Sequence, residues 1–417
     1  MDTDKRPIYP IQVWDITETE FDIKNNYRNE TTFALSNGYI GTRGTFEEAY
    51  DFDIDTGLEG NFVNGFYESE KMRYGEANFG SPLLSQSLLN LPNLKETHVI
   101  LADEKFDMMD GTVEEYERVL HMKEGILERK LIWTSPKGKK TRIQILRLVS
   151  FARKNIMLIS YRVTPLNYSG EIQFVSKMQT DVENHTRKTN PIVDYGPFGR
   201  RLNPDKMWAK NNKMYYEGTT KGSQLTMACG SSHVLWKNND LIKELSWQKD
   251  IKEMMAEISV SVECEQGTTV KLDKFICYST DMGKNELETF VNKELEAAET
   301  DGGLYLEKYQ KEYMESFWKI ADVEIKGNEA VQQGIHFNLY HIIQAAGRDG
   351  HTGMGAKGLS GEGYEGHYFW DTEMYVLPVL IYTEPEVAKK LLDYRYGTLD
   401  QARERARILG HMKGALY

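Results

Sequence analysis

The hydrophobic period changes near residue 280, and this change limits the fold more than any other feature of the sequence. Before it, short segments alternate apolar and polar residues between turn residues, a pattern typical of strands that bury one face. Examples are residues 131–151, 155–166, 170–178 and 268–280. No comparable helical run interrupts them between Leu127 and Asp281. Because strands without crossover helices pair antiparallel, residues 1–280 are predicted to form one large antiparallel β-sandwich.

After residue 280 the pattern becomes helical. Residues 284–299 and 304–320 predict two helices that connect the sandwich to the rest of the chain. Residues 330–346 predict a stronger helix with a continuous apolar stripe. The stripe consists of Ile335, Leu339, Ile342, Ile343 and Ala346.

Four residues punctuate the C-terminal helices. Pro385 suits the first turn of a helix, and Gly397 suits its end. Thr398 can cap the next helix, and Gly410 can end it. Consecutive helices joined by such short turns form antiparallel pairs. Three or four helices are too few to close a barrel, so we expect this helical part to be incomplete in the chain.

Length and charge limit the class of protein. At 417 residues the chain is too long for one compact core, so we expect two domains. Hydrophobic residues make up 40% and charged residues 27%, which is typical of a soluble globular protein. The formal net charge is -12 and no cluster of Lys and Arg appears, so nucleic acid is not an expected partner.

The N-terminal stretch and the cysteines indicate in which cellular compartment the protein is expected. Residues 1–16 carry acids where a signal peptide needs basic residues, and no long apolar run appears anywhere, so we expect a cytoplasmic protein without membrane spans. The cysteines are odd in number and lack metal-ligand spacing, which favours reduced thiols: Cys229, Cys264 and Cys277. The glycosylation sequons are then chance matches, at Asn29, Asn167 and Asn184.

Residues 347–366 form a glycine-rich segment inside the helical part. Gly353, Gly355 and Gly358 make a literal G-x-G-x-x-G, but that motif indicates a dinucleotide site only when a strand precedes it and a helix begins within it. Here a predicted helix precedes it and more loop follows, so a nucleotide site is not favoured. A loop this long is usually functional or disordered. Its polar side chains are Arg348, Asp349, His351, Lys357, Glu362 and Glu365.

The stretch GHYFWDTEMYVLP, residues 366–378, places Trp370 beside Asp371 just after the glycines. Two interpretations are open on the residues alone. Trp370 can pack in the core while Asp371 caps the helix that begins near Thr372. Alternatively, the pair can form one wall of a pocket that grips a polar ring.

Several segments together carry a family resemblance. GHYFWDTEMYVLP, with residues 334–350 and 358–366 before it, closely resembles glycoside hydrolase family 65, the inverting phosphorylases of maltose, trehalose, kojibiose and nigerose. Segments of the N-terminal half resemble that family in the same order. They are residues 30–48, 62–69, 88–95, 121–130 and 150–167. The resemblance covers nearly the whole chain.

The resemblance implies a domain plan. Residues 1–280 are expected to form an N-terminal super-β-sandwich, residues 281–320 a helical linker, and residues 321–417 the start of an (α/α)6 catalytic barrel. Residues 37–44, NGYIGTRG, are then a tight turn and strand of the sandwich, with glycines supplying positive φ, and not part of an acceptor pocket.

The resemblance also gives Trp370 and Asp371 a role. A glucosyl ring packs its axial C–H groups on an aromatic face and offers its hydroxyls to charged acceptors, and the matching family residues hold the glucosyl unit where the bond is cleaved. Phe369 is a weaker candidate for sugar contact, and Tyr368 is more typical of a core residue. Glu373 is expected to be a first-turn acid that complements the helix dipole.

The family mechanism needs one general acid and no base, because phosphate is already an anionic nucleophile. The family's catalytic Glu and its phosphate-binding residues lie beyond the position of Tyr417, so no catalytic residue is assigned in this chain, and the isolated chain is expected to be inactive. Glu362 and Glu365 are not favoured as substitutes. His336 and His341 are expected to make core or linker contacts, and no metal or cofactor is implied.

The expected function is inverting phosphorolysis of an α-linked glucose disaccharide by the full-length protein, giving β-glucose 1-phosphate and the released sugar. We expect the glycine-rich loop to line the acceptor side, with sequence features closer to the kojibiose, nigerose and trehalose branches than to the maltose branch. The partners are the disaccharide and inorganic phosphate, and a homodimer is expected. A hydrolase of the same family and a carbohydrate-binding protein without catalysis remain the alternatives.

Overall fold

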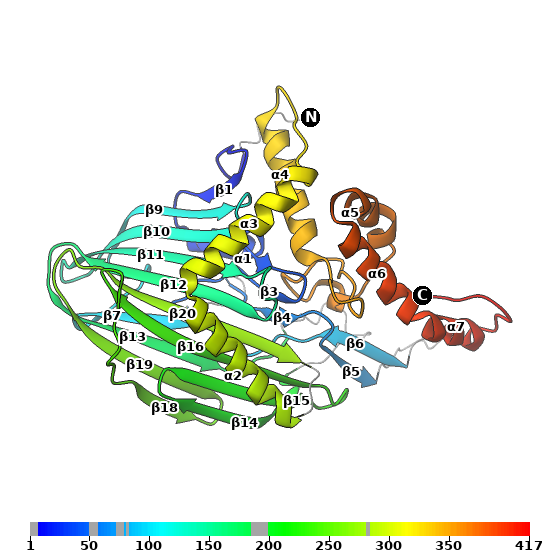
Figure 1. Ribbon diagram of the computed structural model, residues 1–417, viewed down its shortest axis with the longest axis horizontal. Coiled ribbons are helices and arrows are strands. Elements are labelled where there is room, and N and C mark those ends of the chain that lie inside the picture. Colours follow the sequence, from blue (N-terminus) through cyan, green and yellow to red (C-terminus); the bar gives the residue numbers. More distant parts are fainter. Residues whose placement is uncertain (1–6, 50–56, 72–78, 81–82, 185–198, 281–283) are drawn as a thin grey trace.

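The computed structural model describes residues 7–49, 57–71, 79–80, 83–184, 199–280 and 284–417. The first six residues of the N-terminal stretch, and residues 281–283 beside the predicted domain boundary, lie outside these ranges. Within the described ranges a mostly β N-terminal part is followed by helices (Figure 1).

Two antiparallel sheets face each other in the N-terminal part (Figure 1). The larger sheet is, in order, β1 (Asp15–Glu18), β9 (Thr112–His121), β10 (Ile126–Thr134), β11 (Lys140–Val149), β12 (Ile156–Pro165), β20 (Val270–Thr280), β16 (Thr226–Lys237), β15 (Lys213–Thr220) and β14 (Leu202–Lys210), with β17 (Asp240–Leu241) beside β16. The smaller is β18 (Gln248–Lys252), β19 (Met255–Cys264), β13 (Gly170–Gln179), β7 (Thr97–Leu101) and β8 (Glu104–Lys105). This confirms the predicted antiparallel strands.

Two small sheets lie at the end of the sandwich that faces the C-terminal helices (Figure 1). One consists of β2 (Leu35–Ser36), β3 (Ile40–Thr42) and β4 (Asn61–Val63), and the other of β5 (Tyr67–Lys71) and β6 (Leu84–Leu88). A short 3-10 helix η1 (Ile23–Asn25) and α1 (Asn26–Thr32) precede them. The small sheets therefore stand between the sandwich core and the helical part.

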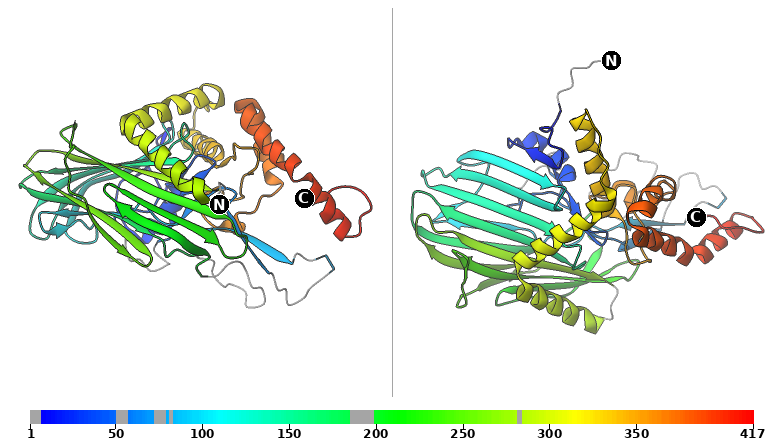
Figure 2. Two further views of the ribbon diagram at one scale, coloured as in Figure 1. Left: turned by 60° about the horizontal axis from the view of Figure 1, so that its bottom comes forward. Right: turned by 45° about the horizontal axis from the view of Figure 1, so that its top comes forward.

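Helices α2 (Lys284–Asp301) and α3 (Gly303–Ala321) pack on the outer face of the larger sheet (Figure 2). Leu287, Val291 and Leu295 of α2 share a buried apolar cluster with residues of β11, β12, β16 and β20. Burying such side chains is the main favourable term for this contact. These two helices thus cover a face of the sheet as well as connecting the two parts.

The remaining helices form the C-terminal part. They are α4 (Glu329–Ala345), the 3-10 turn η2 (Gly363–Gly366), the π-helical turn η3 (Thr372–Val376), α5 (Leu377–Thr383), α6 (Pro385–Gly397) and α7 (Leu399–Ile408). Pro385 begins α6, Gly397 ends it, and Gly410 with φ 86 follows α7. The predicted Thr398 cap is wrong: its side chain makes no capping bond, because its hydroxyl donates back to the Tyr394 and Arg395 carbonyls.

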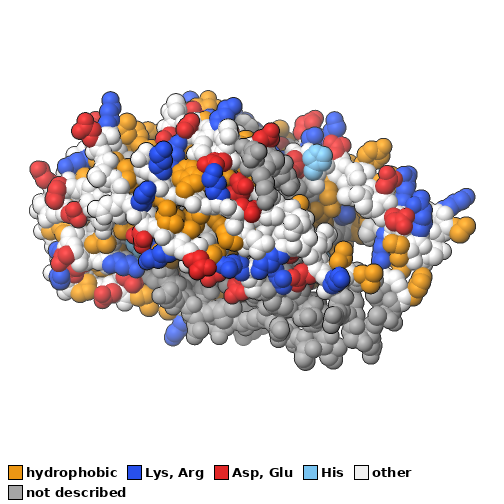
Figure 3. Space-filling view, turned by 90° about the horizontal axis from the view of Figure 1, so that it is seen from below, with side chains coloured by type: hydrophobic (Ala, Val, Ile, Leu, Met, Phe, Trp, Pro, Cys, Tyr) orange, Lys and Arg blue, Asp and Glu red, His pale blue; other side chains and the backbone are white. Residues whose placement is uncertain are grey.

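Surface charge is mixed on the face drawn in Figure 3, where acidic and basic side chains alternate between apolar ones. In the part of the chain that the structure describes, no helix combines the length and the apolar character needed to cross a membrane.

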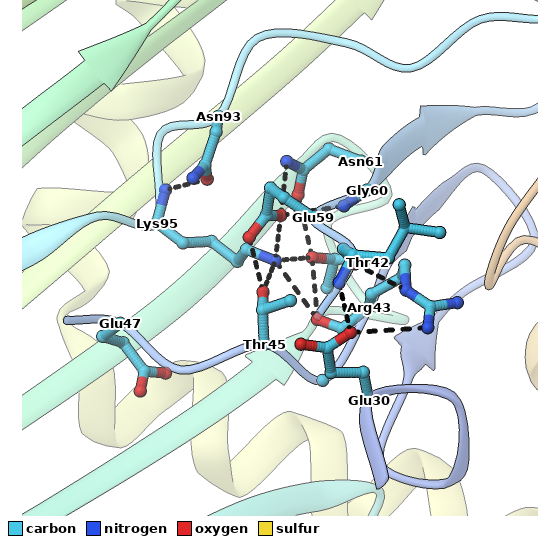
Figure 4. Close-up of polar contacts among 12 residues, drawn as sticks. Glu30, Thr42, Arg43, Thr45, Glu47, Glu59, Gly60, Asn61, Asn93 and Lys95 are labelled. Atoms are coloured by element: carbon cyan, nitrogen blue, oxygen red, sulfur yellow. Dashed lines mark hydrogen bonds and ion pairs between the residues drawn. The ribbon is translucent and has the colours of Figure 1, made fainter. Parts of the chain in front are cut away.

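A buried ionic network ties the small sheets to the sandwich (Figure 4). The ammonium of Lys95, which is 1% exposed, lies 2.6 Å from a carboxylate oxygen of Glu59 and donates to the hydroxyls of Thr42 and Thr45 at 2.8 Å. Burial lowers the pKa of Lys95 to about 8, although Glu59 opposes the shift. Every donor of this ammonium has an acceptor, which is the condition for a charge to stay buried.

A second buried group of charges lies beside the first. Glu47 pairs with Arg147 and, at 3.1 Å, with Arg129, while Glu48 accepts from Arg129 and from the Tyr161 hydroxyl at 2.7 Å. Burial raises the pKa of Glu47, but Arg147 and Arg129 lower it more, to about 2. The pairs hold β10, β11 and β12 to the segment that follows β3.

Removing one partner from this second group is predicted to destabilise the sandwich. Arg147→Ala leaves Glu47 buried with half of its compensation, and breaking a buried pair in this way costs about 3–5 kcal/mol. Urea denaturation followed by far-ultraviolet circular dichroism measures the effect. Lys308→Ala, which removes an exposed pair with Glu312, is the control and leaves the midpoint unchanged. Equal midpoints for both variants would contradict the prediction.

Glu30 is predicted to make stability depend on pH. Burial raises its pKa from about 4.5 to about 7, against the Leu58 amide and the Arg43 guanidinium, which lower it. Between these pH values the folded state binds more protons than the unfolded state, so the free energy of unfolding falls as pH rises. Glu30→Gln removes this contribution, so its urea midpoint changes less between pH 5 and pH 8 than that of the wild type. An unchanged pH dependence would show that Glu30 does not titrate in this window.

Candidate functional site

The chain between α4 and η3 runs along the small sheets and comes closest to them at Gly38, in the turn before β3, and at Gly41 in β3. At Gly38, with φ 83, a side chain would collide with the Ala346 carbonyl, and at Gly41 with the Leu359 carbonyl. NGYIGTRG thus lies in the turn and strand that were predicted. Only Gly38 of its three glycines needs a positive φ, however, and Gly41 is required because the glycine-rich loop approaches so closely.

The G-x-G-x-x-G stretch has none of the surroundings of a dinucleotide site. Helix α4 precedes it, and the 3-10 turn Gly363–Gly366 follows it. Gly353 packs on the ring of Tyr368, where an added Cβ would lie 2.8 Å from a ring carbon. This glycine is therefore needed for packing.

Trp370, Asp371 and Phe369 form an exposed group at the start of η3. Trp370 is 52% exposed and Phe369 41% exposed, so the described residues of this chain enclose neither ring. Asp371 has helical backbone angles, φ -55 and ψ -34, and its side chain makes no capping hydrogen bond. The capping interpretation of Asp371 is therefore wrong, and its side chain is exposed. We call Phe369, Trp370 and Asp371 together the Trp370–Asp371 wall.

Arg395 of α6 contacts the backbone and the side chains around this wall. Its guanidinium makes a two-point pair with Glu373 at 2.5 and 3.1 Å and donates to the Phe369 carbonyl at 3.4 Å. It also lies 5.0 Å from the centre of the Trp370 ring, within range of a cation–π contact. Glu373 lies in the first turn of η3, as predicted, and its carboxylate is also the partner of Arg395. No local spacing signal connects residues 373 and 395.

A π-helical turn, Thr372–Val376, directly follows the wall. Such turns insert an extra residue into a helix and occur often at functional sites. Here the turn runs directly into α5, which has Pro378 in its first turn. Tyr368, which precedes the wall, is different in kind: its hydroxyl donates to Asn64 and its ring contacts Tyr67 and Tyr394, in line with the expected packing role.

Several polar residues of the glycine-rich loop fix the loop itself. Arg348 donates to the carbonyls of Asn37 and Ile343 and to the Tyr313 hydroxyl. Asp349 accepts two backbone amides at 2.8 Å, and these bonds, together with the Thr352 hydroxyl, lower its pKa although burial raises it. Glu365 accepts from Ser85 of β6. His351 and Lys357 are exposed.

A cavity of about 450 Å³ lies between α4, β2 and the loop. It is lined by Ala34, Leu35, Ser36, Asn338, His341, Ile342, Gln344, Ala345, Met354, Ala356, Lys357, Gly358, Leu359 and Ser360. Burial lowers the pKa of His341 to about 4, and its Nδ1 accepts from Gln344 at 2.8 Å. The cavity does not include the Trp370–Asp371 wall.

His336 makes packing contacts between α4 and the N-terminal segment. Its ring stacks on Trp14 with centres 3.6 Å apart, and its nitrogens contact the Val13 carbonyl and Asp322. Among the residues that the structure describes, no group of three His, Cys, Asp or Glu side chains is arranged to hold a metal ion.

Comparison with known proteins assigns the family. The model of the N-terminal domain of glycosyl hydrolase family 65 matches residues 16–317, and the model of the central catalytic domain of that family matches residues 336–417. The chain therefore belongs to glycosyl hydrolase family 65.

Curated relatives match over nearly the whole chain. An α,α-trehalose phosphorylase of Thermoanaerobacter brockii is 43% identical over 99% of this chain and 53% of its own length. A kojibiose phosphorylase of the same organism is 32% identical over 97% of this chain and 50% of its own length. The chain thus spans about half the length of the curated relatives it matches.

Among solved structures, a putative kojibiose phosphorylase from the human microbiome matches with a TM-score of 0.84 at 24% identity, over 96% of this chain and 50% of the other. At that identity the match shows the fold alone. It supports the fold described above, a mostly β N-terminal part followed by helices.

Arg395 is predicted to keep the wall rigid. Arg395→Ala removes the two-point pair with Glu373, so the amides of residues 369–376 should exchange with deuterium roughly tenfold faster, a difference of about 1.4 kcal/mol in local opening. Arg395→Lys keeps the charge without the planar fork and should fall between. Hydrogen exchange read by mass spectrometry measures both. Arg403→Ala, which removes an exposed pair with Asp400, is the control. Equal exchange in all three variants would contradict the bracing role.

Proposed function

We propose that the protein, with a complete catalytic domain, carries out inverting phosphorolysis of an α-linked glucose disaccharide and yields β-glucose 1-phosphate and the released sugar. The observation that carries this proposal is the exposed Trp370–Asp371 wall in a chain of glycosyl hydrolase family 65. The wall lies at the start of η3, which the Arg395–Glu373 pair joins to α6. The helices from α4 onward are part of an (α/α)6 barrel in this proposal.

The wall suits one glucosyl unit. The exposed indole of Trp370 offers a flat apolar face to axial C–H groups, and the adjacent Asp371 carboxylate accepts from two neighbouring hydroxyls. Arg395 holds the backbone just before both residues at the Phe369 carbonyl, so little backbone order has to be created on binding. Phe369, which directly precedes Trp370 and is 41% exposed, is the further candidate for an apolar contact with the sugar.

The chemistry divides between this wall and groups beyond Tyr417. A phosphate oxygen attacks the anomeric carbon from the face opposite the glycosidic oxygen, the carbon–oxygen bond to the leaving sugar breaks, and a carboxylic acid gives its proton to the leaving oxygen. The attacking phosphate then gives up its own proton, which restores the acid. We expect a Glu beyond Tyr417 to be this acid and basic groups there to hold the phosphate. No metal or organic cofactor takes part.

The relatives favour trehalose as the substrate. The relatives from Thermoanaerobacter brockii and Geobacillus stearothermophilus that are named α,α-trehalose phosphorylases are 43% and 37% identical to this chain, and the kojibiose phosphorylase of T. brockii is 32% identical. We therefore propose α,α-trehalose first, with glucose as the released sugar, and kojibiose second. A homodimer and a cytoplasmic location remain predictions from the sequence.

A substrate panel tests the proposal. The gene at its natural length is expressed, and the protein is incubated with trehalose, kojibiose, nigerose and maltose, with and without phosphate. We expect β-glucose 1-phosphate from trehalose only when phosphate is present. Free glucose at the same rate without phosphate would show a hydrolase, and binding of the sugar without any turnover would show a binding protein.

Substitutions in the wall test its role. Trp370→Ala and Asp371→Asn should each lower kcat/KM by about 100-fold or more, because each removes contacts that orient the glucosyl unit for attack. Tyr382→Phe is the matched control, because this side chain on α5 is 82% exposed and lies outside the wall, and it should keep full activity. If Trp370→Ala keeps wild-type kcat/KM, the wall does not bind the substrate.

A further inference from the structure

We propose that Asn64 and Tyr67, both in the sandwich domain, are positioning residues for the Trp370–Asp371 wall. This inference rests on the proposed function for its kinetic consequence. Asn64 lies in the turn after β4 and Tyr67 begins β5, about three hundred positions before the wall, and both contact the segment that leads into it.

Asn64 uses its side-chain amide to join three segments. Its nitrogen donates to the carbonyls of Gly38 at 3.1 Å and Gly353 at 2.9 Å, and its oxygen accepts from the Tyr368 hydroxyl at 2.7 Å. The residue is 4% exposed, so water does not compete for these bonds. One buried side chain thus fixes the start of the glycine-rich loop and the residue two positions before Trp370.

The turn that carries Asn64 is shaped for this contact. Gly65 has φ 87, and an added Cβ would lie 2.7 Å from the Thr352 methyl group. Gly353 in turn packs directly on the Tyr368 ring. Both glycines leave room for a side chain of this segment, the Thr352 methyl group at Gly65 and the Tyr368 ring at Gly353, beside the loop that Asn64 bonds. A side chain at Gly65 or Gly353 would therefore disturb the contact between Asn64 and the loop.

Tyr67 holds the same segment at a second point. Its hydroxyl donates to the Gly366 carbonyl at 2.7 Å, and its ring meets the Tyr368 ring edge to face, with centres 6.2 Å apart. Burial raises the pKa of Tyr67 to about 12, so the hydroxyl stays a donor at physiological pH. Tyr368 then contacts Tyr394 of α6, the neighbour of Arg395.

The wall is consequently held from two sides. The sandwich fixes Gly366 and Tyr368, and α6 fixes the Phe369 carbonyl and Glu373. Trp370 and Asp371 lie between these anchors on a chain too short to reorient while the anchors hold. The sandwich domain therefore takes part in sugar binding without touching the sugar, by setting the direction of two side chains on the other domain.

Tyr67→Phe tests the proposal with a minimal change, because it removes one hydroxyl and keeps the ring. In the natural-length enzyme we expect KM for the disaccharide to rise about tenfold, in keeping with the loss of one buried hydrogen bond, while KM for phosphate stays the same. A purely stabilising role would move neither constant below the melting temperature. Asn64→Asp, which keeps the acceptor for Tyr368 but loses both donors, should have the same effect.

Tyr278→Phe is the matched control. Its hydroxyl also donates to a backbone carbonyl at 2.7 Å, that of Pro92, but inside the sandwich. We expect a similar loss of thermal stability and wild-type kinetics. If Tyr67→Phe has the same disaccharide KM as Tyr278→Phe, the positioning role is overturned.

A second readout separates this inference from the proposed function. Hydrogen exchange of residues 366–371 needs no substrate, and it should be faster in Tyr67→Phe than in Tyr278→Phe. If the wild type shows no phosphorolysis, the proposed function fails, while faster exchange still supports the anchoring by Tyr67. Equal exchange in the two variants overturns the anchoring whatever the activity.

Discussion

The close approach of the glycine-rich loop to the small sheets of the sandwich is the contact on which the rest of the structure depends. Side chains at Gly38 and Gly41 would collide with carbonyls of Ala346 and Leu359, so the two domains meet backbone to backbone. At that distance the peptide groups of one domain are within reach of side chains of the other, and buried peptide groups need such partners. Asn64, Arg43 and Arg348 supply them.

The polar core of the sandwich continues into this contact. Arg43 donates to the Leu58 and Ser360 carbonyls and lies 3.5 Å from Glu30, while its own carbonyl accepts from Lys95 (Figure 4). A buried charge is stable only when all its hydrogen-bonding capacity is met, so each of these groups constrains the positions of the others. The loop at Ser360 is thereby part of a network that reaches the centre of the sandwich.

The strands and helices that could be predicted follow from sequence patterns among residues close together in the chain. The alternation in residues 131–151 predicts two strands with a turn at Ser135, and they form β10 and β11, because period-two burial depends only on neighbouring residues. The predicted cap at Thr398 failed for a related reason. A hydroxyl near a helix end can bond either the helix that follows or the one that precedes it, and the sequence does not distinguish these.

The order of a β part and a helical part, the family resemblance and the residue types of the candidate wall can all be recognised in the amino-acid sequence. Each follows from local periodicity or from short motifs such as FWDTE, which need no knowledge of distant partners. The folded chain was needed to show that Asp371 caps nothing, that Glu373 pairs with Arg395, and that Asn64 bonds Tyr368. These depend on where chain segments far apart in sequence meet, and side-chain hydrogen bonds over a few ångströms carry no spacing rule that a linear pattern can show.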